Sequence, residues 1–68
     1  MERKPVTSTN IKSIGYENGT LEIEFRDGGV YEYSVVSEEI YKEFIVDSSI
    51  GSYFNRNIKN YFTAKKIS

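Results

Sequence analysis

The chain has 68 residues, with nine Lys and Arg against ten Asp and Glu, and it contains no Cys, His or Trp. This length is enough for one small domain and excludes two, so we treat residues 1–68 as a single domain. Without Cys and His there are neither disulfides nor the usual zinc ligands, and packing or association must stabilise the fold. From the absence of Cys and of long apolar stretches we expect a cytoplasmic protein with no metal, no cofactor and no membrane segment.

The charges are unevenly distributed along the chain. Residues 1–50 hold five basic and ten acidic groups, whereas residues 51–68 hold four basic groups and no acidic one. This asymmetry indicates either an end that binds a polyanion or a basic tail that pairs with the acidic body of the same molecule.

The first half of the chain predicts strands joined by tight turns. Residues 11–16 mix β-branched and aromatic side chains and are typical of a short strand, with an irregularity expected at Gly15. Asn18-Gly19 follows, and it is the dipeptide that best tolerates the two positive φ angles of a type I′ hairpin turn.

Two further strands are predicted on either side of Asp27-Gly28-Gly29. Residues 20–25 alternate, with one apolar face and one face that carries Glu22 and Glu24, which we expect to be exposed to water. Residues 30–34 place Tyr31 and Tyr33 together on one face. The three strands form an antiparallel meander.

Two amphipathic helices are predicted in the second half. Ser37 can cap a helix that runs to about Asp47, and either Ser48 or Ser49 can cap a second one. At helical spacing the apolar residues form one stripe on each helix: Ile40, Tyr41, Phe44 and Ile45 on the first, and Ile50, Tyr53, Phe54, Ile58 and Tyr61 on the second. For residues 62–68 the sequence allows two conformations, an extended segment or a frayed helix end.

The element order β-β-β-α-α defines the expected fold class. It is α+β, with a three-stranded antiparallel meander followed by two helices that pack on one sheet face. The face expected to receive the helices carries Leu21, Ile23 and Phe25, because it is the apolar side of the middle strand.

Several short motifs together resemble a known family. They are residues 10–16 (NIKSIGY), 21–25 (LEIEF), 29–33 (GVYEY), 51–55 (GSYFN) and the pair Ile58-Lys59 followed by Tyr61. In order and spacing they resemble the KTSR domain family, short bacterial domains with a central Tyr-x-Tyr that stand alone or follow some lysyl-tRNA synthetases. The resemblance covers residues 6–67 and implies an uncharacterized function, with RNA binding as the possibility that the synthetase context raises.

Catalysis is not expected from this composition. General acid-base chemistry near neutral pH most often uses His, and nucleophilic catalysis most often uses Cys or a base-activated Ser. Glu22 and Glu24 remain as a carboxylate pair, but an exposed strand face favours solvation over proton transfer. We therefore expect a binding module and no enzyme.

The basic end of the chain holds the candidate binding residues. Arg56, Lys59, Lys65 and Lys66 are expected to contact phosphates of RNA or another nucleic acid, with Tyr53 or Tyr61 stacking on a base. Only four cations are present and the pI is about 5.3, so such binding would be weak and sensitive to salt.

Other interpretations of the same chain compete with this hypothesis. Tyr31 and Tyr33 could stack on bases, but packing against the sheet is the favoured interpretation. Asn55 could contact a ligand or, as favoured here, close a turn against the sheet backbone. The chain as a whole could instead be a protein-interaction or self-association module that uses surplus aromatic surface or an open strand edge.

Overall fold

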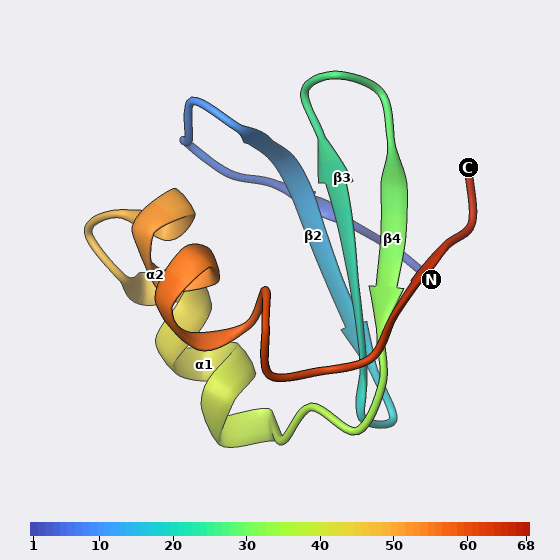
Figure 1. Cartoon of the computed structure of the whole chain (residues 1–68). Coiled ribbons are helices and arrows are strands. Elements are labelled where there is room, and N and C mark those ends of the chain that lie inside the picture. The colour runs from blue at the N-terminus through green and yellow to red at the C-terminus, as the bar shows by residue number, and fades with distance from the viewer.

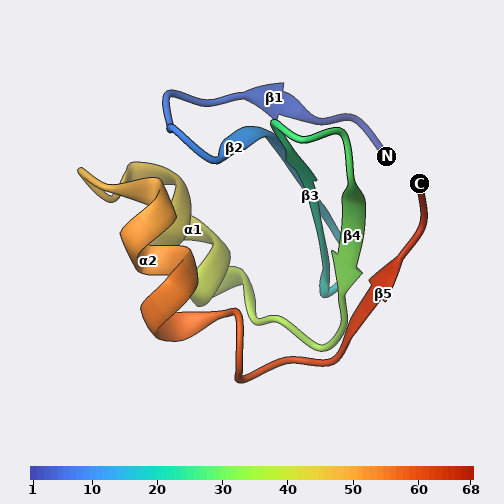
Figure 2. The same cartoon turned by 45° about the horizontal axis from the view of Figure 1, so that its top comes forward.

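The computed structural model describes all residues 1–68. The strands are β1 (Lys4–Pro5), β2 (Ile11–Glu17), β3 (Thr20–Phe25), β4 (Val30–Tyr33) and β5 (Ala64–Lys66), and the helices are α1 (Glu38–Val46) and α2 (Ile50–Asn57). The five strands form one antiparallel sheet in the order β1-β2-β3-β4-β5. The sheet curves around the two helices, which both lie on its concave side (Figure 1 and Figure 2).

The sheet has five strands where the sequence predicted three, because both ends of the chain add an edge strand. β1 pairs with β2, with Lys4 opposite Ile14, and β5 pairs with β4, with Lys65 opposite Glu32. Neither segment alternates apolar and polar residues, so neither carries the sequence signal of a strand. Backbone pairing with an existing neighbour is what makes them strands.

Gly15 is the position that lets β1 reach the sheet. A Cβ atom at Gly15 would lie 2.7 Å from the backbone oxygen of Glu2 and 3.1 Å from Cγ of Arg3. The prediction that the strand is irregular at Gly15 is wrong, because the irregularity lies earlier: the register of β2 against β3 shifts between Ile11 and Ser13. What Gly15 provides is room for the N-terminal segment to cross close to the strand.

The two hairpin turns have the geometry that the sequence predicted. Asn18 and Gly19 have φ angles of 50° and 81°, the left-handed values that a type I′ turn requires. Between β3 and β4, Gly28 has a φ of 104°, and Asp27 Oδ1 accepts a hydrogen bond from the Gly29 backbone N–H at 2.9 Å. Both turn predictions are confirmed.

Both helix starts are also confirmed. Ser37 Oγ accepts from the backbone N–H of Ile40 at 3.3 Å, and α1 begins directly after it. Of the two candidate caps for α2, the structure uses Ser49, whose Oγ accepts from the Ser52 N–H at 3.4 Å.

The apolar stripe of α2 is shorter than predicted, because the helix ends at Asn57. Ile58 is the C-cap; its side chain is fully buried, and its N–H donates to the Phe54 carbonyl at 3.0 Å. Tyr61 lies beyond the helix and is 70% exposed. On α1, Ile45 is likewise more exposed than its place in the predicted stripe implies.

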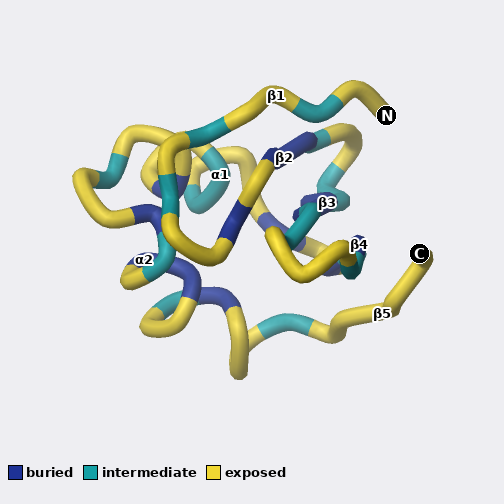
Figure 3. The backbone as a smooth tube through the Cα atoms, turned by 90° about the horizontal axis from the view of Figure 1, so that it is seen from above, coloured by how far each residue is buried: buried dark blue, intermediate teal, exposed yellow.

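The core lies between the concave face of the sheet and the helices. Phe54 of α2 packs edge-to-face against Phe25 and Tyr33, with ring centroids 5.4 and 5.7 Å apart, and Tyr16 of β2 stacks on Tyr41 of α1 at 4.6 Å. The eleven buried residues of the cluster are Ile11, Ile14, Leu21, Ile23, Tyr33, Val36, Phe44, Ile50, Tyr53, Phe54 and Ile58. Figure 3 shows the buried stretches in the central strands and the helices, whereas β1 and β5 are exposed.

Candidate functional site

The structure divides the predicted basic cluster into two groups. Arg56 lies on α2 and Lys59 follows it by three residues, both exposed. Lys65 and Lys66 lie on β5, where they are the register partners of Glu32 and Tyr31 of β4. Figure 2 shows the chain running away from α2 before it reaches β5, so the four cations do not form one patch.

The two tyrosines expected to stack on a base differ sharply in position. Tyr53 is 7% exposed, its ring stacks on Phe44 with centroids 5.5 Å apart, and its hydroxyl donates to Glu43 at 2.9 Å. Burial, followed by this hydrogen bond, raises the pKa of Tyr53. The ring is thus part of the core, and only the exposed Tyr61 is free to meet a ligand.

The central Tyr-x-Tyr also belongs to the packed interior. Tyr33 is a member of the core cluster, and burial, followed by the proximity of Tyr31, raises its pKa. Tyr31 is half-buried and packs edge-to-face on Phe25 at 5.6 Å. The packing interpretation of this motif agrees with the structure.

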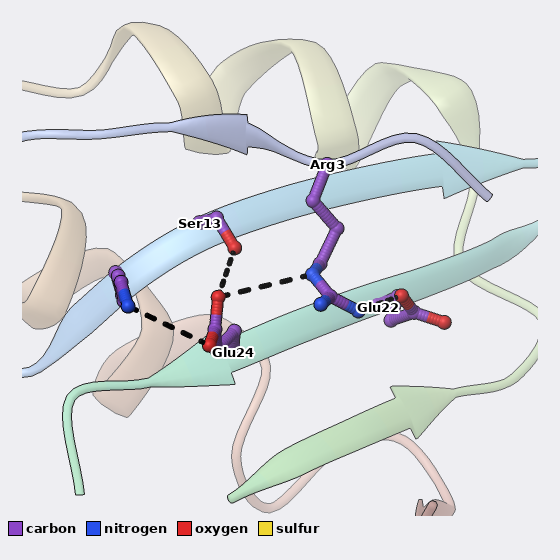
Figure 4. A network of polar contacts seen from close by, with 5 residues as sticks. Arg3, Ser13, Glu22 and Glu24 are labelled. Carbon is purple, nitrogen blue, oxygen red and sulfur yellow. Dashed lines mark hydrogen bonds and ion pairs between the residues drawn. The ribbon is translucent and has the colours of Figure 1, made fainter. Parts of the chain in front are cut away.

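The outer face of the sheet carries a polar network that the sequence analysis missed (Figure 4). Arg3, just before β1, reaches across β2 to donate to Glu22, and its Nε lies 4.0 Å from Glu24. Glu24 also accepts from Ser13 Oγ at 2.8 Å and lies 3.9 Å from Lys12 Nζ. Both carboxylates therefore have cationic partners within the chain.

The predicted exposure of Glu22 is wrong. Its residue is only 6% exposed, because the N-terminal segment covers this part of the sheet. The carboxylate can be buried there because Arg3 supplies the opposite charge, and a buried charge without such a partner would be strongly unfavourable.

An open groove of about 730 Å³ lies between the segment before β2 and the start of α2. We call it the arginine groove; its lining consists of residues 6–10, Arg26, residues 48–52, Asn55 and Arg56. Only two of these thirteen residues are hydrophobic, and none is Asp or Glu. In a chain with ten acidic residues, this is a surface from which carboxylates are absent.

Both arginines of the groove are held through their Nε atoms. Arg26 Nε donates to the backbone oxygen of Ser8 at 2.8 Å, and Arg56 Nε donates to Ser52 Oγ at 3.2 Å. One terminal nitrogen of Arg56 lies 4.0 Å from Asp47, a weak contact, and Arg26 forms no ion pair. The terminal NH₂ groups are therefore available, in oriented guanidinium groups, for an anionic ligand.

A second hollow, of about 530 Å³, adjoins the arginine groove. The residues common to both are Thr9, Asn10, Arg26, Gly51 and Asn55. The rest of this lining is Ile11, Phe25, Asp27 and Phe54. We call it the aromatic hollow, because its lining includes the rings of Phe25 and Phe54.

Asn55 does not close a turn against the sheet, so the favoured interpretation of this residue is wrong. It is exposed, no hydrogen bond joins its amide to the sheet backbone, and it lines both the arginine groove and the aromatic hollow. Asn10, in the segment before β2, lines the same groove and hollow.

Of the residues that line the arginine groove, the sequence analysis named Arg56 and Asn55 as candidates and did not name Arg26 or Asn10. Asn10 and Asn55 stand in the first and fourth motifs, and their position outside the apolar stripes was a usable signal. Arg26 carried no such signal, because it follows a strand directly and reads as part of a turn. Only the register, with the Arg26 N–H donating to the Asn10 carbonyl at 2.9 Å, brings it to the groove.

No three His, Cys, Asp or Glu side chains are grouped so that they could hold a metal ion. The helices have nine and eight residues, and neither has the length and apolar character needed to cross a membrane.

Comparison with known proteins identifies the family. The KTSC domain model matches residues 7–62. An uncharacterized protein of Stutzerimonas stutzeri (strain A1501) is 34% identical over 61 residues, covering 87% of this chain and 86% of that protein. The crystal structure of a KTSC domain protein from Yersinia pestis is 42% identical and superposes with a TM-score of 0.95 over 98% of this chain and 97% of the other.

These matches correct the family name expected from the motifs, which was KTSR. None of the matched proteins named here is a lysyl-tRNA synthetase, so the synthetase context implied by the resemblance is not shown. The order and spacing of the motifs nevertheless led to the right group of proteins: the chain belongs to the KTSC domain family.

Proposed function

We propose that this chain is a small non-catalytic module that binds RNA, with phosphate groups of the RNA in the arginine groove. The observation that carries the proposal is the pair of oriented guanidinium groups in a groove without carboxylates. Guanidinium forks match phosphate oxygens in geometry as well as charge. No carboxylate lines the groove itself; the acids beside it are Asp47, 4.0 Å from Arg56, and Asp27, in the lining of the adjoining hollow.

Other predicted residues can extend the contact. Lys59 and Tyr61 follow α2 directly and are exposed, so a strand leaving the groove along α2 would meet a further cation and a free ring. Lys65 and Lys66 lie on β5 and would contact only a longer strand that passes around the molecule. Tyr53 does not contact the RNA in this proposal, because its ring is buried in the core.

The salt dependence of RNA binding tests this proposal. With about three phosphate contacts, the logarithm of the association constant for a short single-stranded RNA should fall with log salt at a slope of about −2. Arg26→Gln and Arg56→Gln should each weaken binding and reduce the slope by about 0.7, whereas Lys42→Gln, a charge removed from α1 outside the groove, should change it little. Fluorescence anisotropy measures both quantities, and a flat response to salt would contradict the proposal.

The rival function, a protein-interaction or self-association module, has one structural feature in its favour. β5 is an open sheet edge, and all three of its residues are exposed. It is however short and carries two lysines, features by which proteins prevent edge-to-edge pairing, and two copies of β5 would bring like charges together. We expect light scattering to give a monomer throughout a dilution series; a concentration-dependent dimer would favour the rival function.

A further inference from the structure

The arginine groove and the aromatic hollow share a boundary, and together they offer two chemically different compartments. The groove is polar and is lined by Arg26 and Arg56, whereas the hollow shares Arg26 with it and adds the apolar residues Ile11, Phe25 and Phe54 and one acid, Asp27. Volumes of about 730 and 530 Å³ lie within the range of roughly 300–1,000 Å³ that is common for small-molecule sites. A ligand that fills both must combine an anionic group with a flat apolar one.

We propose that the two compartments together bind one nucleotide unit of a single strand, with the phosphate in the arginine groove and the base in the aromatic hollow. This inference rests on the proposed RNA binding and specifies where one nucleotide lies.

The phosphate position follows from the two arginines. They come from places far apart in sequence, the residue after β3 and the last turn of α2, yet both line the groove. Each Nε is already bound within the chain, so the terminal NH₂ groups are the donors that remain for phosphate oxygens.

The base position follows from the ring of Phe25 at the end of β3, because the other ring of the hollow, Phe54, is buried in the core. Phe25 is half-buried and packs edge-to-face on Phe54, which leaves it at the surface of the hollow. Bases stack on aromatic side chains in single-strand binders, and such stacking tolerates any base because every base has a π-face. Arg26 is the next residue after Phe25, so the phosphate and base contacts are adjacent in the chain.

Asn10 and Asn55 stand where the groove meets the hollow. Neither amide side chain takes part in a hydrogen bond in the structure, and each presents donors and an acceptor at the shared boundary. An amide in this position can bond to the polar edge of a base, as proteins commonly do when they read single-stranded RNA. The two asparagines therefore allow the site to distinguish a nucleotide from inorganic phosphate.

The test compares three probes on the complete ¹⁵N-labelled chain: adenosine monophosphate, inorganic phosphate and adenosine. Adenosine monophosphate should shift the amide signals of residues 8–10, 25–27 and 50–56, and should bind about tenfold more tightly than inorganic phosphate because of the added stacking and edge contacts. Adenosine alone should shift only the signals of the hollow, at higher concentration.

Three variants assign the roles. Arg26→Gln should weaken the binding of adenosine monophosphate and of inorganic phosphate alike, by about tenfold. Asn55→Ala should reduce the affinity for adenosine monophosphate toward that for phosphate and leave phosphate binding unchanged. Lys66→Gln removes the same charge from β5, outside both compartments, and should change neither affinity. A dispersed spectrum of each variant shows that it has folded.

Two results would overturn the inference. One is equal affinity and equal shifts for adenosine monophosphate and phosphate, which would mean an anion site without a base compartment. The other is a set of shifts centred on Lys65 and Lys66. Failure of the proposed function has a different signature: RNA would not bind at all, whether or not the mononucleotide shifts the groove signals. If Arg26→Gln left RNA binding intact, the proposed function would stand, but the nucleotide site proposed here would be wrong.

Discussion

At the scale of single residues, the absence of one side chain decides where the N-terminal segment lies. In a strand, Ala is normally more stable than Gly by roughly 0.5–1 kcal/mol. At Gly15 the sign should reverse, because a Cβ would lie 2.7 Å from the Glu2 backbone oxygen. We expect Gly15→Ala to lower the free energy of unfolding by about 1–3 kcal/mol, measured by urea denaturation.

The control for Gly15→Ala is the same substitution in a chain shortened by residues 1–5. The atoms that would clash with the new Cβ are then gone, so the substitution should be neutral or stabilising. A loss of stability of the same size in the shortened chain would mean that the close approach of Glu2 and Arg3 is not the cause.

A second residue-scale prediction concerns alkaline pH. The pKa of Tyr53 is raised from its ordinary value of 10.0, first by burial and then by the hydrogen bond to Glu43. The unfolded chain therefore releases this phenolic proton at lower pH than the folded chain. The stability that depends on it is complete below pH 10 and is lost as the pH rises through the folded-state pKa.

Tyr53→Phe should accordingly make the decline in stability above pH 10 less steep. Part of the decline should remain, because burial also raises the pKa of Tyr33. Tyr61→Phe removes a hydroxyl from an exposed ring and serves as the control. Urea denaturation at a series of alkaline pH values measures the slope, and equal slopes for Tyr53→Phe and the unmodified chain would contradict the assignment.

Single residues also show what the sequence could not reveal. Asn18-Gly19 was predictable because the turn conformation depends on those two residues alone. The burial of Glu22 was not, because it depends on Arg3, nineteen residues away. The place of Asn55 in the lining of the groove depends likewise on a segment more than forty residues earlier in the chain.

At the scale of elements, the start of α2 offers a matched pair of serines. Ser49 caps the helix through the Ser52 N–H, whereas adjacent Ser48 makes no capping contact. Ser49→Ala should lower the free energy of unfolding by about 1 kcal/mol. Ser48→Ala should stay within about 0.5 kcal/mol of the unmodified chain. Thermal denaturation compares them, and equal effects would mean that the cap is not Ser49.

The predictability of each element follows from what specifies it. The central strands and both helices carry their own periodicity and caps, and were predicted with small errors at their ends. β1 and β5 have two and three residues and are entirely exposed, so no burial pattern marks them in the sequence. The extent of α2 was overestimated because the stripe continued to Tyr61 in the sequence, although the helix ends at Asn57.

At the scale of the whole molecule, the ring of Phe54 joins α2 to two strands of the sheet. Phe54 contacts Phe25 of β3 and Tyr33 of β4. Phe54→Ala should cost about 3–5 kcal/mol, comparable with the whole stability that a core of this size supplies. We expect the variant to be largely unfolded by circular dichroism.

Phe62→Ala is the control for Phe54→Ala, because Phe62 is only half-buried at the margin of the same core. It should remain folded with a smaller loss. A folded, nearly unaffected Phe54→Ala chain would contradict the packing described above.

The outer face of the sheet has a consequence for how a ligand arrives. Glu22, Glu24 and Glu32 point away from the helices, whereas the arginine groove is bounded by α2 on the other side. The outer carboxylates lie beside Arg3, Lys12 and Lys65, so this face carries little net charge. On the helical side α1 carries the exposed acids Glu38, Glu39 and Glu43, and the lining of the groove itself holds none. A polyanion is therefore attracted by a local patch and not by a whole face, so its orientation is selected only within about one Debye length of the groove. Added salt should slow capture at the groove more than it hastens release.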